Sequence, residues 1–218
     1  MPLRAAAICG LLAPVTFVVG LVLGDLAQPD TFSPADDNIS DIGAQTADQA
    51  WLYNQVAANL NGLLIIAFAL GLWRALGSGW LARLGVAGLA VIGLTRFLEG
   101  FLRLDCRGMD TGCENTSWQA DGHGIESGIA AALFFVVPVL LAFAFRRMPE
   151  WRALWLPSLF AVPAIIAVQV LFSVIGDGAA VRAGSIAWFV WLGLLAGWLL
   201  RVATSDFRAE PAIQQADR

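Results

Sequence analysis

The sequence predicts an all-α membrane protein, a polytopic bundle of six transmembrane helices with both chain ends in the cytoplasm. Of its 218 residues, 58% are hydrophobic and only 14% are charged, whereas roughly a quarter of the residues in a soluble domain are charged. The apolar residues also fall into six runs, each close to the roughly 20 residues that a spanning helix needs. These runs use nearly the whole chain, so we expect no second folded domain.

The first apolar run decides whether the protein has six spans or five. It follows Arg4 and is longer than the roughly 7–15 apolar residues of a cleavable signal peptide, so we interpret it as a retained span. Cleavage after Leu26-Ala27 is the alternative. The predicted spans are residues 5–24, 54–76, 80–102, 123–145, 154–175 and 185–200, within a transmembrane domain of residues 1–204, and residues 205–218 form a cytoplasmic tail.

Arginine sets the predicted orientation, since the chain contains no lysine. By the positive-inside rule, the side with more arginine faces the cytoplasm, which places both termini inside and the protein in the cell (plasma) membrane. We find no polybasic run of the kind that binds nucleic acid, so membrane lipid is the expected partner. The inner arginines are Arg4, Arg74, Arg83, Arg146, Arg147, Arg152, Arg201, Arg208 and Arg218, against Arg103, Arg107 and Arg182 outside.

Two polar connections lie on the predicted outer side. Residues 27–53 form the longest, with five aspartates and no arginine, and residues 103–122 contain Cys106 and Cys113. An oxidising exterior permits a disulfide, and we predict that these two cysteines pair. Free thiols or a metal site are the alternatives, but the pair lacks the CxxC spacing and the further ligands that zinc requires, so we expect no metal and no cofactor.

Costly polar residues within the spans gather in their outer halves, since a charge at a helix centre costs about 2.5–3.5 kcal/mol. Arg96 and Glu99 are three residues apart in the third span and can form an ion pair, as can Glu99 and Arg103. His123 and Glu126 share one face at the start of the fourth span. This distribution predicts a polar pocket at the outer face. The alternative is a network in which these residues satisfy one another and fix helix packing.

One loop segment carries a family resemblance. The run Asn38-Ile39-Ser40-Asp41-Ile42-Gly43-Ala44, followed by Tyr53-Asn54, resembles the DUF998 family of bacterial and archaeal membrane proteins, whose function is uncharacterised. The cysteine-containing second loop and the histidine that opens the fourth span agree with that pattern, and the resemblance covers about residues 11–200. The same segment is similar to the six-span Frag1/DRAM proteins, which are linked to lipid and membrane regulation.

The segment also has a direct physical interpretation. Ser40 and Asp41 can cap a short turn, and Gly43 permits a bend. The functional alternative is that this loop folds over the outer pocket and brings Ser40 and Asp41 toward His123 and Arg96. Both interpretations can hold together.

Three functions compete on this evidence. The first is binding of a lipid head group or small amphipathic molecule in the outer pocket. The second is hydrolysis of an outer-leaflet lipid, with His123 and Glu126 as catalytic candidates, although similar ceramidase-like hydrolases need several histidines and this chain has one. The third is an accessory subunit whose Gly71, Gly85, Gly88 and Gly93 pack against a partner protein. The expected ligand-binding residues are Ser40, Asp41, Asn54, Arg96, Glu99, His123 and Glu126.

Overall fold

The computed structural model describes the backbone of residues 1–216 and the side chains of residues 1–204. Six helices in it are long and apolar enough to cross a membrane, and the described chain contains no strand, which confirms the predicted fold class. The helices are α1 (Leu3–Leu26), α2 (Asn61–Ala75), α3 (Trp80–Glu99), α4 (Trp118–Phe145), α5 (Trp155–Phe172) and α6 (Asp177–Ala216). Three further turns complete them: η1 (Ile39–Gly43) and η3 (Pro149–Leu154) are 3₁₀-helical, and η2 (Leu52–Leu60) is π-helical and leads directly into α2.

Two helices begin earlier than the sequence pattern indicated. α4 begins at Trp118 instead of residue 123, because the Ser117 hydroxyl caps it by accepting a hydrogen bond from the Ala120 N–H at 3.2 Å. α6 begins at Asp177 instead of residue 185 and continues to Ala216 through most of the predicted tail. The predicted tail's side chains, and residues 217–218 entirely, lie outside the described residues.

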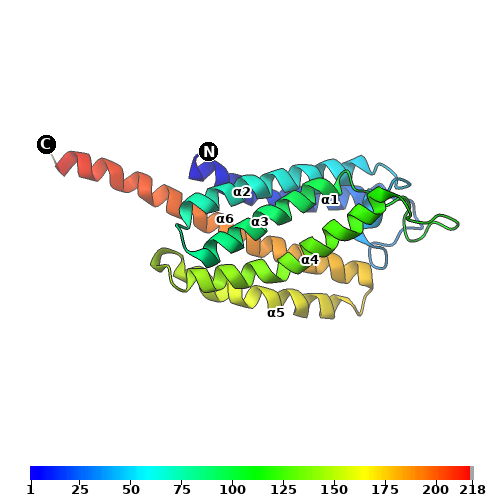
Figure 1. Ribbon diagram of the computed structural model, residues 1–218. Helices are drawn as coiled ribbons and strands as arrows, with labels where there is room; N and C mark the ends of the chain where they lie inside the picture. The colour runs from blue at the N-terminus through cyan, green and yellow to red at the C-terminus, as the bar shows by residue number, and fades with distance from the viewer. Residues whose placement is uncertain (217–218) are drawn as a thin grey trace.

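The six helices form a ring in which each packs against its neighbours in the sequence, and α6 returns to α1. Figure 1 shows both termini at one end of this bundle and the connections 27–51 and 100–117 at the other. We call these the terminal end and the loop end. Which of them faces the cytoplasm stays a prediction.

Large side chains fill the terminal half of the ring. Phe68 of α2 and Phe145 of α4 are fully buried there, and Phe145 stacks on Trp151 of η3 with ring centroids 5.5 Å apart. The indole of Trp191 donates a hydrogen bond to the Ser158 hydroxyl at 3.1 Å, which joins α6 to α5. This half therefore leaves little space for anything but protein.

The glycines predicted to face a partner protein instead lie between helices of this chain. Gly71 faces Ala6, Gly85 faces Leu141 and Gly88 faces Val137. At Gly93 an added Cβ would lie 2.9 Å from the Gly62 carbonyl oxygen, so only glycine allows α3 to approach α2 so closely. That prediction was wrong because small residues serve close packing inside a bundle as readily as between subunits. The close approach also fixes the polar end of α3 beside η2.

Candidate functional site

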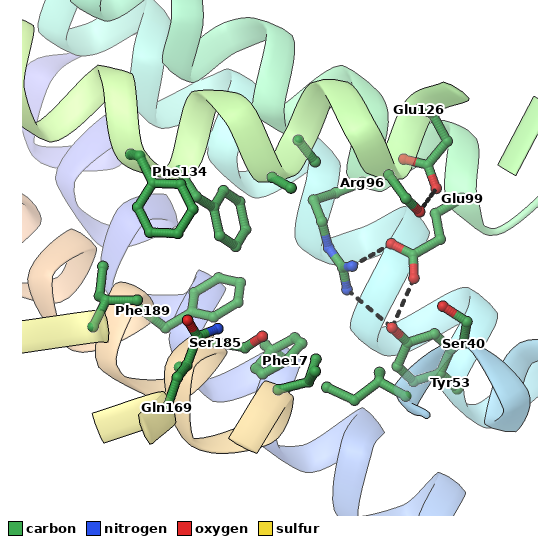
Figure 2. A pocket seen from close by; sticks show the side chains of 18 residues that line it. Phe17, Ser40, Tyr53, Arg96, Glu99, Glu126, Phe134, Gln169, Ser185 and Phe189 are labelled. Atoms are coloured by element: carbon green, nitrogen blue, oxygen red, sulfur yellow. Dashed lines mark hydrogen bonds and ion pairs between the residues drawn. The ribbon is translucent and has the colours of Figure 1, made fainter. Parts of the chain in front are cut away.

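The loop-end half of the ring encloses a cavity of about 310 Å³ (Figure 2). Side chains from η1, η2 and every long helix except α2 line it. The charged groups Arg96, Glu99 and Glu126 gather at one end, and phenylalanine rings lie at the other, beside Gln169 and Ser185. The cavity is therefore amphipathic, with a charged end and an aromatic end.

Arg96 is held by a network at the charged end. Its guanidinium forms an ion pair with Glu99, one turn further along α3, and also donates to the Ala57 carbonyl oxygen of η2 at 2.7 Å. The Tyr53 hydroxyl donates to the other oxygen of the Glu99 carboxylate, Oε1, at 2.7 Å. A buried arginine and a buried glutamate thus neutralise each other, and their hydrogen bonds join α3 to η2.

His123 and Glu126 form a second group on α4, together with Ser40 of η1. His123 Nδ1 lies 3.0 Å from the Leu102 carbonyl oxygen and 3.3 Å from Glu126 Oε1, and Nε2 lies 3.0 Å from Ser40 Oγ. A carbonyl oxygen only accepts, so Nδ1 carries a proton. In the neutral ring Nε2 then accepts the Ser40 hydroxyl proton, which fixes the tautomer of His123 and the direction of Ser40.

The aromatic end is built from stacked rings. Phe17 of α1 stacks on Phe189 of α6, and Phe134 of α4 stacks on Trp188, each pair with centroids 4.3 Å apart. Trp188 is fully buried, so these four rings form the boundary between the cavity and the filled terminal half. Within residues 1–204, the side chains of Gln169 and Ser185 also line the cavity and form no hydrogen bond.

Comparison with known proteins gives one match. A family model described as "Protein of unknown function (DUF998)" matches residues 11–202, which is most of the chain. The chain belongs to the DUF998 family. No curated protein and no solved structure matches this DUF998 protein.

Hydrogen bonds join the two loop-end connections of this DUF998 protein to each other at the loop end of the cavity. Cys106 and Cys113 are disulfide-bonded, as predicted, and residues 105 and 107 of the same connection are hydrogen-bonded to Gln45 and Thr46. The Gln45 N–H donates to the Leu104 carbonyl oxygen at 2.9 Å. Hydrogen bonds from Arg107 hold the pKa of Asp110 at about 2, below its usual value.

Two residues predicted to bind ligand stabilise this loop layer and do not line the cavity. The Asp41 carboxylate accepts the backbone N–H of Gly108 at 3.0 Å and of Asn38 at 3.2 Å. Burial raises the pKa of Asp41, although these N–H groups act in the opposite direction. Asn54 donates to the Gly43 carbonyl oxygen at 3.0 Å, which attaches η1 to η2. Both residues position Ser40.

The other five predicted residues lie together. Ser40, Arg96, Glu99 and Glu126 line the cavity, and His123 lies directly behind Ser40. In the described chain Arg103 forms no ion pair with Glu99, because Tyr53 and Arg96 occupy that carboxylate. No sequence pattern predicted a role in the cavity for Tyr53 or for the phenylalanines. Tyr53 is the only tyrosine and opens a span, which was a usable signal, whereas nothing distinguishes these phenylalanines from lipid-facing ones.

The cavity opens sideways in the loop-end half, where α4 and α5 diverge. Ala131 and Val181 line it and are exposed. In Figure 1, α4 and α5 lie together toward the terminal end and diverge toward the loop end. A side chain added at Gly124 or Gly128 of α4 would meet no atom within 4 Å. A molecule dissolved in the bilayer therefore has a route to the cavity.

Among the described residues, no group of three or more His, Cys, Asp or Glu is placed to hold a metal ion.

Proposed function

We propose that this protein binds a lipid or a small amphipathic molecule in the loop-end cavity, at the outer face of the plasma membrane. The single observation that carries the proposal is the form of the cavity, which has charged residues at one end, aromatic rings at the other and a lateral opening where α4 and α5 diverge. Its volume of about 310 Å³ is at the lower end for ligand sites, which hold roughly 300–1,000 Å³. A head group and the first part of a chain fit this space.

The positive-inside rule supports the outer face, because most arginines lie toward the terminal end. The disulfide supports it independently, since Cys106 and Cys113 belong to the loop end and disulfides persist in oxidising compartments. Ligand would then enter from the outer leaflet.

Co-purification tests the proposal. The protein is extracted in mild detergent, and native mass spectrometry measures bound small molecules in the wild type and two variants. Ala130→Phe places a ring in the cavity, since Ala130 lines it. Ile129→Phe is the matched control, because Ile129 is the preceding residue on α4 but is 44% exposed and outside the cavity lining.

We expect the wild type and Ile129→Phe to retain the same ligand and Ala130→Phe to lose it. Equal retention by all three proteins would mean that the bound molecule sits on the outer surface. A wild type that retains nothing above a detergent control would count against the proposal as well.

A second function is favoured by one observation, the contact between Ser40 and His123. With Nδ1 held by Leu102, the ring is oriented to take the Ser40 proton, and Glu126 lies 3.3 Å behind Nδ1. A serine, a histidine and a carboxylate in this order are the parts of an acyl-transfer nucleophile. In such a reaction Ser40 Oγ would attack a lipid ester carbonyl and release the alcohol, and water would then cleave the acyl-serine.

Covalent labelling separates this second function from binding. A fluorophosphonate probe marks activated serines, so labelling of the wild type that disappears in both Ser40→Ala and His123→Ala would support a hydrolase. Ser185→Ala is the control, because Ser185 also lines the cavity but forms no contact with His123 or Glu126. Absence of labelling in a wild type that retains ligand would leave binding as the function.

A further inference from the structure

Resting on the proposed function, we infer that the cavity selects an amphipathic cation, a molecule with an ammonium group on an apolar body. The sequence alone left both signs of charge open, because Arg96 could meet an anion and the glutamates a cation. The contacts in the cavity remove that ambiguity.

Arg96 is already occupied. Its two terminal nitrogens donate to Glu99, to the Ala57 carbonyl oxygen and, at 3.5 Å, to the Tyr53 hydroxyl. Within the described residues the Arg96 Nε lacks a partner, but that atom is buried away from the cavity surface. An anionic ligand would have to displace Glu99 to reach this charge.

Glu126 is the acidic side chain that stays available to a ligand. Its Oε1 accepts from the Ser127 hydroxyl at 3.0 Å and faces His123 Nδ1. Neither neighbour has to be charged to make these contacts. Ser127 is a neutral hydroxyl, and the contacts of His123 are met by the neutral ring, whose Nδ1 proton is shared with Leu102 and whose Nε2 accepts from Ser40. In the part of the chain with described side chains, Glu126 Oε2 forms no hydrogen bond and is not enclosed by protein. One arginine thus faces two carboxyl groups at this end, and that arginine is paired with Glu99.

A buried carboxyl group without a cationic partner can ionise only at a cost, and a ligand cation beside it lowers that cost. The phenylalanine rings add a second reason, since the face of an aromatic ring attracts an ammonium group. The centroid of the Phe17 ring already lies 5.4 Å from the Arg96 guanidinium carbon, within the range of a cation–π contact. The remaining rings suit the apolar body of the ligand.

The ammonium group could belong to a lipid head group or to a free amphipathic amine, and the test distinguishes these sources. The purified protein, in an uncharged detergent, is titrated with dodecylamine, dodecanol and dodecanoate, which have the same number of carbon atoms and carry a cationic, a neutral and an anionic head group. Thermal unfolding reports binding, because a ligand that binds only the folded state raises the melting temperature. The same titration in nanodiscs of phosphatidylethanolamine or phosphatidylglycerol then shows whether the lipid amine already occupies the site.

We expect dodecylamine to raise the melting temperature more than dodecanol, and dodecanoate to have the smallest effect. Glu126→Gln should weaken dodecylamine binding about tenfold, the contribution of one hydrogen bond to a charged group. Asp121→Asn is the matched control, because it removes the same charge from an exposed position of α4 and should leave binding unchanged. Weaker binding of dodecylamine in phosphatidylethanolamine discs would identify the lipid as the source, and equal binding in both discs a free amine.

Two outcomes would overturn the inference in different ways. Equal stabilisation by dodecylamine and dodecanol, unchanged in Glu126→Gln, would keep the cavity as an amphipath site and remove its selectivity for cations. No stabilisation of the wild type by any of the three, together with no ligand after purification, would remove the proposed function too. The wild-type series needs no substitution, so a Glu126→Gln protein that fails to fold does not prevent the decision.

Discussion

The two halves of the helix ring are built from the same apolar residues and differ in how the space between the helices is used. In the terminal half, fully buried rings such as Phe68 and Phe145 occupy the interior. In the loop-end half, α4 diverges from α5, and polar side chains bond to one another around a cavity. The difference indicates that the terminal half is the scaffold and that the loop-end half carries the site.

Removing a phenylalanine ring should affect the two halves differently, and this is the largest effect we expect. Phe68→Ala empties a fully buried position, which should lower the free energy of unfolding by about 4 kcal/mol. Phe135→Ala removes a half-buried ring that already borders the cavity, so its cost should be below about 1.5 kcal/mol. Denaturant titration of the two variants in one detergent measures the difference. Equal losses would mean that both halves are packed alike.

Removing one member of the Arg96–Glu99 pair at the charged end of the cavity should lower the free energy of unfolding. Arg96→Met leaves a buried carboxylate without its partner and should cost about 3 kcal/mol. The double variant Arg96→Met with Glu99→Met should cost less than the single one, because no buried charge is left. The same denaturant titration reports both values. A double variant that loses the sum of the two single losses would contradict this pairing.

The loop layer should contribute less than the helices below it. Cys106→Ser with Cys113→Ser opens the loop closed by the disulfide and should lower the free energy of unfolding by about 2 kcal/mol. Mild reduction of the wild type is the matching experiment, and the two losses should agree. A loss in the double serine variant but none on reduction would point to the substitutions and not to the loop.

The smallest effect concerns pH and Asp110. Arg107 lowers the pKa of Asp110 to about 2. The ionised carboxylate therefore contributes its full share to the free energy of unfolding above about pH 4, the pKa of aspartate in the unfolded chain. That contribution is lost as the pH falls through about 2. Asp110→Asn should therefore be less stable than the wild type at pH 7, by about 0.5 kcal/mol for an ion pair near the surface. Melting temperatures measured from pH 7 to pH 2 should converge at the acid end. A difference that grows toward low pH would contradict the assignment.

Much of the fold was predictable because its signals are local. Six apolar runs and the arrangement of arginine and cysteine predict the helices and the disulfide without any knowledge of packing. The bounds of α4 and α6 were not predicted, since Ser117 caps α4 within a stretch that is polar like a loop, and the helical glycines before Ser185 resemble a turn.

The candidate site was predictable only in part. Arg96 and Glu99 are three residues apart on one helix, so their pairing follows from spacing. The contact of Ser40 with His123 joins residues 83 positions apart, and only the family-like segment pointed to it. Arg96 is occupied in part by the Ala57 carbonyl oxygen, and Glu126 bonds through one oxygen to Ser127, which leaves the other available. No sequence pattern specifies the positions of Ala57 and Ser127.

An experimental density map of the protein purified from its native membrane in mild detergent would test the central claim most directly. We predict non-protein density in the loop-end cavity, reaching from Glu126 toward the ring of Phe189, and none around Phe68 or Phe145 in the terminal half. A map in which α4 packs against α5 along its full length, with the cavity closed by side chains, would contradict the account.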